Sequence, residues 1–151
     1  MIFTRTNSKE HGLAAIEMMV ILPILLLLLC AIFEVGRIFM HYTMLNKALQ
    51  NGARYAVIDV YGTDRASLIA DSNEIKNMVV FGNKTGSSNN QTLDSILPGL
   101  SASNISVDDS SSDYVTVSAN YAYTPVFTSV PIIGGVFSLN MNASSIMGVS
   151  P

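Results

Sequence analysis

The chain is poor in several residue types that mark common classes of protein. Its 151 residues include no tryptophan and one cysteine, Cys30. A single cysteine excludes an intrachain disulfide and a cysteine-based zinc site. Charged residues make up only 13 %, and the formal net charge of −3 disfavours nucleic acid as a partner. Neither His11 nor His41 has a cysteine or second histidine at metal-ligand spacing, so we expect no metal and no cofactor. Because no nucleophile elbow or nucleotide-binding glycine motif is present, we predict that the chain is not an enzyme.

Apolar residues are concentrated near the amino terminus. Hydrophobic residues amount to 49 % and the mean hydropathy is +0.39. Residues 18–33 carry no formal charge, and extension back to Leu13 adds only one, at Glu17. At 1.5 Å per residue, residues 13–33 would be roughly 31 Å long, about the hydrocarbon thickness of a bilayer. We predict a transmembrane helix over residues 13–33.

A polar leader, residues 1–12, precedes this segment, and its cations Arg5 and Lys9 favour a cytoplasmic amino terminus. Three hypotheses compete for this region. A secretory signal peptide would have a shorter apolar core than this chain has. It would also have a small-residue cleavage site after that core, and the chain has no clean site of this kind there. A plain signal anchor fits the length but leaves Glu17 unexplained. A leader of the type IV pilin kind, cut after Gly12, explains Gly12, Glu17 and the long helix together.

Glu17 itself has two interpretations. A carboxylate near the centre of a membrane helix costs about 3 kcal/mol and usually has a partner. Glu17 could reach the headgroups from its place near the helix end. Alternatively, cleavage after Gly12 would expose a positive amine on Leu13, and Glu17 would pair with such an amine on a neighbouring subunit. The spacing alone favours neither interpretation.

The helix is expected to continue beyond the membrane as an amphipathic extension over residues 34–59. Pro23 predicts a kink or local loosening within the membrane segment, and Glu34 and Arg37 lie three apart and can pair. Apolar residues recur at spacings of three and four and predict one continuous stripe. The stripe consists of Val35, Phe39, Tyr42, Leu45, Leu49, Ala53 and Ala56.

Residues 60–151 predict an extracytoplasmic αβ domain. A short helix is expected near residues 64–70, and a second helix from Ser72, after Asp71, to a stop at Gly82. Alternating residues predict strands around 105–107, 115–123 and 137–143, with a hairpin loop at 108–113. The predicted fold class is α+β: a long N-terminal transmembrane and amphipathic helix followed by a small, pilin-like antiparallel β-sheet domain. Such a sheet needs a cover, and the distal half of the long helix is the candidate.

Residues 12–57 resemble the TadE-like (TadE/TadF) pseudopilins of the tight-adherence (Tad/Flp) type IV pilus system. Their sequence is GLAAIEMMVILPILLLLLCAIFEVGRIFMHYTMLNKALQNGARYAV. The C-terminal tail is also similar to the usual ending of that family. Met18 stands where the major Flp pilin typically has tyrosine, which favours a minor pseudopilin. The residues that carry the resemblance are Gly12, Glu17, Leu22, Pro23, Glu34, Gly36, Arg37, Ala48, Leu49, Gln50, Asn51, Gly52, Ala53, Arg54, Tyr55 and Ala56.

The resemblance implies a prepilin-type leader, residues 1–12, that a prepilin peptidase removes between Gly12 and Leu13, which makes Glu17 the fifth mature residue. It implies a bacterial inner-membrane protein with one span, a cytoplasmic amino terminus and a periplasmic or extracellular domain, in the membrane or in the pilus. The implied partners are the peptidase, other pilins and pseudopilins, Tad inner-membrane assembly proteins and membrane lipid. Residues implied in helix pairing and assembly are Glu17, Glu34, Gly36, Arg37, Arg54 and Tyr55.

The function implied is a minor pseudopilin required for assembly of Tad/Flp pili, and so for adherence and biofilm formation. The alternative is a signal-anchored membrane protein whose external β-rich domain binds a ligand or a protein. The pattern Asp108-x-Ser110-x-Ser112 fits a von Willebrand A metal site, which larger TadG-like proteins contain. We expect a polar hairpin loop there instead, because that fold needs parallel strands with crossover helices, for which the 39 residues after Ser112 are too few.

Overall fold

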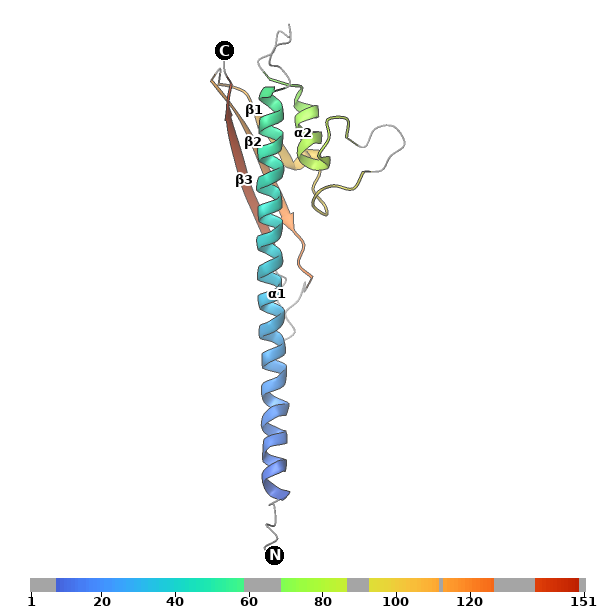
Figure 1. Cartoon of the computed structure of the whole chain (residues 1–151), viewed down its shortest axis with the longest axis vertical. Helices are drawn as coiled ribbons and strands as arrows, with labels where there is room; N and C mark the ends of the chain where they lie inside the picture. The colour runs from blue at the N-terminus through green and yellow to red at the C-terminus, as the bar shows by residue number, and fades with distance from the viewer. Residues whose placement is uncertain (1–7, 59–68, 87–92, 112, 127–137, 150–151) are drawn as a thin grey trace, which may run out of the picture. The chain divides into compact units, whose positions relative to one another are not determined.

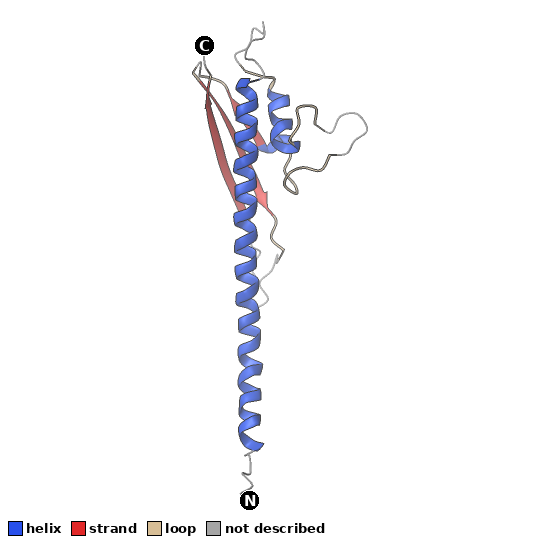
Figure 2. Ribbon diagram, in the orientation of Figure 1, coloured by secondary structure: helices blue, strands red, loops and turns tan. Residues whose placement is uncertain are grey.

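The computed structural model describes residues 8–58, 69–86, 93–111, 113–126 and 138–149, with the backbone alone for 8–11. The chain forms two compact units, residues 1–37 and 38–151. A long N-terminal helix followed by a small antiparallel sheet confirms the predicted α+β class (Figures 1 and 2). The elements are α1 (Ser8–Ile58), α2 (Ser72–Phe81), a 3₁₀ turn (Ala102–Asn104), β1 (Ile105–Asp108), β2 (Tyr114–Tyr123) and β3 (Leu139–Gly148).

Every described residue of the first unit belongs to α1. The helix runs through Pro23 without interruption, so the proline ends no element, although it removes one backbone donor. An 18-residue window of α1 has a mean hydropathy of 2.8, and none of that window is buried. By length and composition, α1 can therefore cross a membrane, which is compatible with a single-pass anchor.

The second unit places the C-terminal part of α1 in a hydrophobic core. Leu45, Leu49, Ala53 and Ala56 recur every three or four residues, and each is fully buried. They belong to one continuous core together with residues of α2 and of all three strands. The prediction that the distal half of the long helix covers the sheet is thus confirmed.

The helix α2 begins and ends where local signals predict. The Asp71 carboxylate accepts a hydrogen bond from the backbone N–H of Asn73 at 2.8 Å, which caps the first turn. Gly82 adopts φ +74°, a left-handed conformation that costs glycine little, and its N–H bonds to the carbonyl of Met78. On the buried face of α2, Ile75, Val79 and Val80 are fully enclosed.

The three strands form one antiparallel sheet in the order β1-β2-β3. Ile105 pairs with Ala119, which in turn pairs with Ala143. Along β2, buried residues alternate with half-buried and exposed ones, so one face of the sheet contributes to the core and the other faces outward. The buried residues of β2 are Val115, Val117, Ala119, Tyr121 and Tyr123.

The predicted continuous stripe on α1 is wrong in its first half. The last four residues of the predicted stripe are buried as expected, but its first three, Val35, Phe39 and Tyr42, are exposed. The face of α1 that leads into the core passes instead through Ile38 and residue 41, both half-buried. The spacing of apolar residues predicted the period of the helix correctly, but it did not predict the residue of α1 at which burial in the core begins.

Two further predictions reach into parts of the chain outside the described residues. The short helix expected near residues 64–70 falls almost wholly there. The predicted last strand, 137–143, included residue 137, which also lies outside them. The strand β3 covers Leu139 to Gly148, so it confirms the predicted strand from Leu139 and extends five residues beyond its predicted end.

Candidate functional site

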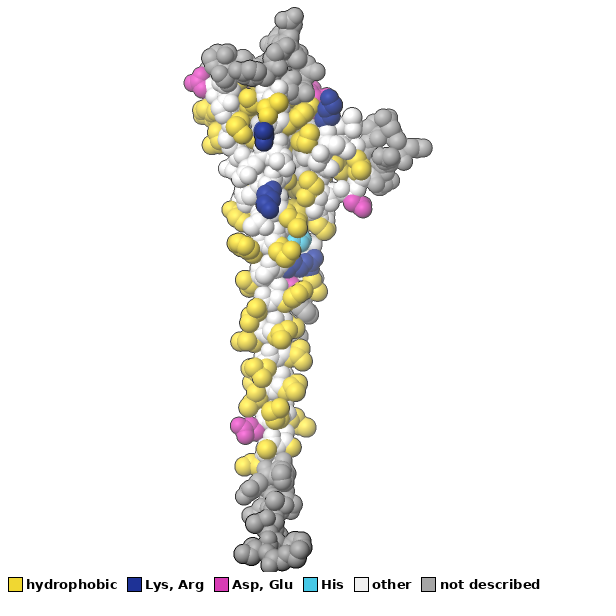
Figure 3. Space-filling view, viewed as in Figure 1, with side chains coloured by type: hydrophobic (Ala, Val, Ile, Leu, Met, Phe, Trp, Pro, Cys, Tyr) yellow, Lys and Arg dark blue, Asp and Glu magenta, His cyan; other side chains and the backbone are white. Residues whose placement is uncertain are grey.

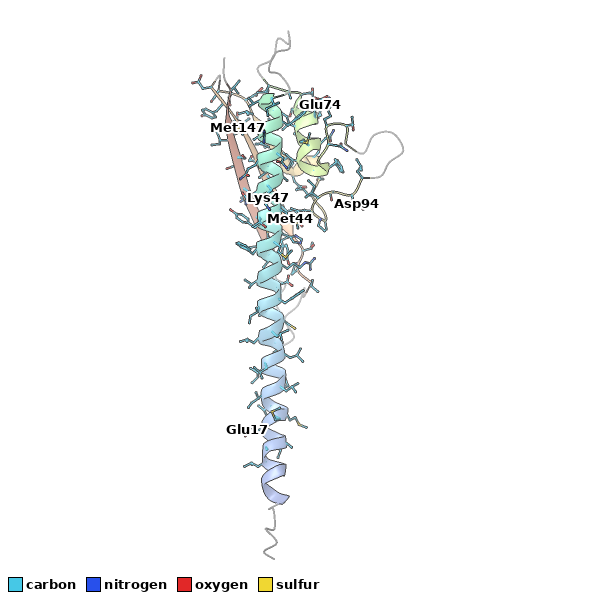
Figure 4. All side chains as sticks on the ribbon, viewed as in Figure 1. Glu17, Met44, Lys47, Glu74, Asp94 and Met147 are labelled. Atoms are coloured by element: carbon cyan, nitrogen blue, oxygen red, sulfur yellow. The ribbon has the colours of Figure 1, made fainter. Side chains whose placement is uncertain are left out.

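The predicted processing residues lie in the exposed first turns of α1. The Gly12–Leu13 bond is inside the helix, and both residues are exposed. A β-carbon placed on Gly12 would have no atom of the described residues within 4 Å, so packing against that part of the chain does not require glycine there. Glu17 is exposed and projects from the side of α1 (Figure 4). It lies five residues beyond Gly12, roughly 7.5 Å along the helix axis.

A second predicted group, Glu34, Gly36 and Arg37, follows Glu17 by 17 residues or more, about 26 Å along the axis. Glu34 and Arg37 are half-buried, whereas Gly36 is exposed with open space around it. Their position on one helix rules out a single pocket that would contain them together with Glu17. They are better described as points along a helix surface.

Arg54 and Tyr55 lie near the end of α1 in the second unit. Arg54 is exposed, while Tyr55 is half-buried and its hydroxyl donates a 2.9 Å hydrogen bond to Oε2 of Glu74 on α2. Tyr55 therefore has a role within the chain, since it ties α1 to α2. The implied role of both residues in assembly stays a prediction.

Gly52 is a structural residue that sequence reasoning gave no role. A β-carbon at this position would overlap Cγ2 of Val79 on α2 and lie 3.6 Å from the backbone oxygen of Ile75. The absence of a side chain at Gly52 lets the two helices approach. A glycine inside an amphipathic helix, beside small Ala48 and Ala53, was the available signal.

His41 was considered only as a metal ligand, and the structure places it in an aromatic contact. Its ring meets that of Tyr123 edge-on, with centroids 5.1 Å apart. The hydroxyl of Tyr121 lies 3.4 Å from Nδ1 of His41 and donates a 2.9 Å hydrogen bond to the backbone oxygen of Pro98. These contacts fasten α1 to the end of β2.

The loop between β1 and β2 is the predicted polar hairpin connection. The backbone N–H of Ser110 donates to Oδ1 of Asp108 at 3.1 Å, and the Ser110 hydroxyl donates to the same atom. The side-chain bond, followed by the backbone bond, lowers the pKa of Asp108. Among the described residues there is no group of three or more histidine, cysteine or acidic side chains that could hold a metal ion.

The outward face of the sheet contributes to an open groove of about 770 Å³. Its lining combines hydroxyl and amide side chains with Tyr42 of α1 and with the apolar residues Ile105, Ala119 and Ala143, and it includes no charged side chain. Neutral groups of this kind donate and accept hydrogen bonds but offer no acid–base pair for catalysis. The polar side chains from the strands are Ser106, Ser118, Asn120, Asn142 and Ser144.

Comparison with known proteins identifies the N-terminal stretch. Residues 12–54 match the family model described as TadE-like protein. The match confirms the predicted resemblance to this family over 43 of the 151 residues. It includes every residue predicted to act in processing or assembly except Tyr55, and the C-terminal tail lies outside it. No curated protein and no solved structure matches the chain.

Proposed function

We propose that this protein is a minor pseudopilin, processed by a prepilin peptidase and required for assembly of Tad/Flp pili. The observation that carries the proposal is the TadE-like match over residues 12–54, which begins at the residue after which cleavage is expected. In this role the chain is the substrate of an enzyme and has no catalytic activity of its own. Its place is the bacterial inner membrane, with the leader in the cytoplasm and the αβ domain outside.

The surroundings of Gly12 support cleavage at the Gly12–Leu13 bond. A peptidase must bring its catalytic groups against the backbone, and no described side chain lies within 4 Å of a β-carbon placed at Gly12. The bond is helical, so the first turns of α1 must open before cleavage. Glycine inside a helix costs about 0.5–1 kcal/mol relative to alanine, which makes this turn easier to open.

The surroundings of Glu17 support a role between subunits. The side chain is exposed on a helix surface whose neighbours, Ile16 and Met18, are apolar and exposed as well. A carboxylate in such a setting is stabilised by a positive partner, and cleavage creates one on the Leu13 of each subunit. Glu17 would therefore select the register in which one pseudopilin helix packs beside the next pilin.

The test of processing is the mass and N-terminal sequence of the protein from cells with and without the peptidase. We expect the mature chain to begin at Leu13 only when the peptidase is present. Gly12→Val should block this cleavage. Gly36→Val is the matched control, because Gly36 is also an exposed helical glycine with open space around it. Cleavage of Gly12→Val at the normal rate, or an intact leader in wild-type cells, would refute the proposal.

The second measurement concerns assembly. Deletion of the gene should abolish Tad/Flp pili, adherence and biofilm formation, and the wild-type chain should restore them. Uncleaved Gly12→Val should insert into the membrane without restoring pili. If it restores pili fully, assembly does not require cleavage and that part of the proposal is refuted. Normal pili in the deletion strain would instead favour the signal-anchored binding protein.

A further inference from the structure

The exposed apolar surface of α1 does not end at Phe33. All exposed residues of α1 from Met18 to Met44 are apolar or aromatic, or are glycine (Figure 3). Between Phe33 and Leu45 the exposed large side chains are Val35 and then four that we call the collar: Phe39, Met40, Tyr42 and Met44. The collar side chains are between 42 % and 67 % exposed.

The charged residues and the histidine of the same turns lie outside the arc of the collar. Glu34, Arg37 and His41 are half-buried there. Thr43 lies within the arc, is half-buried, and its hydroxyl donates to the backbone oxygen of Met40 at 2.8 Å. A helix surrounded by water has the opposite arrangement, with polar groups outward and apolar groups covered. The collar thus has the surface of a helix in an apolar medium.

The length of this surface matches a whole bilayer. After Glu17, the next exposed charged residue on α1 is Lys47, and Figure 4 shows Lys47 close to Met44 on the helix. Thirty residues of helix separate Glu17 from Lys47, roughly 45 Å. A bilayer with its headgroup layers is about 40–45 Å thick, whereas its hydrocarbon core is about 30 Å.

We infer that the collar lies in the interfacial layer of the membrane, so that lipid contacts α1 as far as Met44. The inference rests on membrane insertion of α1, which is part of the proposed function, and not on cleavage or pilus assembly. Tyrosine is suited to this layer, because its ring is apolar and its hydroxyl reaches water. Methionine adapts its flexible side chain to an irregular environment.

A second copy of the chain is the other occupant to consider, and the spread of the collar disfavours it. At 100° per residue, Phe39, Met40, Tyr42 and Met44 cover roughly 200° of the helix circumference. A single packed helix needs a stripe a little over 100° wide. Lipid can contact a helix on all sides, so it accounts for the whole 200° arc of the collar.

The test uses tryptophan as a depth probe, because the chain contains none. Phe39→Trp reports on the collar, Leu26→Trp on the membrane span and Ile146→Trp on the outward face of β3. These three sites have comparable exposure, 67 %, 56 % and 62 %. Each full-length variant is reconstituted in phosphatidylcholine vesicles that carry bromine either high or deep on the acyl chains.

We expect shallow bromines to quench Phe39→Trp at least twofold more than deep ones, and deep bromines to quench Leu26→Trp most. Ile146→Trp should be quenched by neither. If Leu26→Trp is quenched but Phe39→Trp behaves like Ile146→Trp, the collar lies outside the bilayer and the inference is overturned, while the anchor stands. If the emission of Phe39→Trp changes with the number of protein molecules per vesicle and not with bromine, the collar contacts a second copy of the chain. That result would also overturn the inference. Absence of quenching in Leu26→Trp would overturn insertion itself.

Discussion

The contact between Gly52 and Val79 allows a stability prediction that tests the packing of α1 on α2. Gly52→Ala adds a β-carbon that would overlap Cγ2 of Val79. Valine in a helix has one strongly preferred rotamer, so Val79 cannot turn aside easily. The backbone oxygen of Ile75, 3.6 Å from the same position, limits movement in another direction. The two helices must therefore separate slightly.

Two effects of opposite sign determine the size of the change. Overpacking of a well-filled core costs about 1–3 kcal/mol. Replacement of glycine by alanine in a helix returns up to about 1 kcal/mol. With a rigid neighbour the first effect dominates, and we expect a net loss of about 1–2 kcal/mol. For a domain of this size that corresponds to a fall in Tm of about 5–10 °C.

The assay is thermal unfolding of the full chain in detergent micelles, followed by the near-ultraviolet circular dichroism of the buried tyrosines. Gly36→Ala is the control, since a β-carbon there meets nothing within 4 Å and only helix propensity changes. In a Val79→Ala background the overlap is removed, and Gly52→Ala should then be neutral or stabilising. Equal destabilisation in both backgrounds would refute the role of Val79.

Three other changes probe single contacts. Glu17→Ala should insert normally but fail to support pili in electron micrographs, and normal piliation would leave Glu17 as a headgroup-facing residue. Tyr55→Phe removes the hydrogen bond to Glu74 and should cost about 1–2 kcal/mol in the same unfolding assay; an unchanged Tm would contradict this. Ser110→Ala should raise the pKa of Asp108 toward its usual value of 3.8 in a carboxyl NMR titration. Because the pKa of Asp108 is lowered in the folded chain, the ionised carboxylate stabilises the loop at neutral pH, and this contribution is lost as pH falls below 3.8 through the folded pKa. An unchanged pKa of Asp108 in Ser110→Ala would argue against the Ser110 hydroxyl as the cause of the lowered pKa.

The parts of the fold that local interactions determine could be predicted from the sequence. The helix α2 depends on Asp71 at one end and Gly82 at the other, and both act within a turn of the chain. The alternation from Val115 to Tyr123 likewise follows from the period of a strand that is buried on one face.

Contacts between distant residues could not be predicted in this way. Tyr55 and Glu74 are 19 residues apart, and nothing in either local pattern says that they meet. The same holds for the contact of Gly52 with Val79, which depends on how closely two helices cross. The candidate processing residues, Gly12 and Glu17, came from spacing and family resemblance. The structure adds that the chain itself leaves them exposed.

The end of the covered stretch on α1 can, however, be explained from the length of β2. The buried residues of β2 run from Val115 to Tyr123, eight steps of about 3.3 Å, or roughly 26 Å. At 1.5 Å per residue, that length covers about 18 residues of helix. The covered stretch of α1, from His41 to Ala56, is 15 steps or roughly 23 Å long and so lies within that reach, and His41 is the residue that meets the ring of Tyr123. Apolar residues of α1 before that point, such as Phe39, lie beyond the reach of the sheet and need another environment.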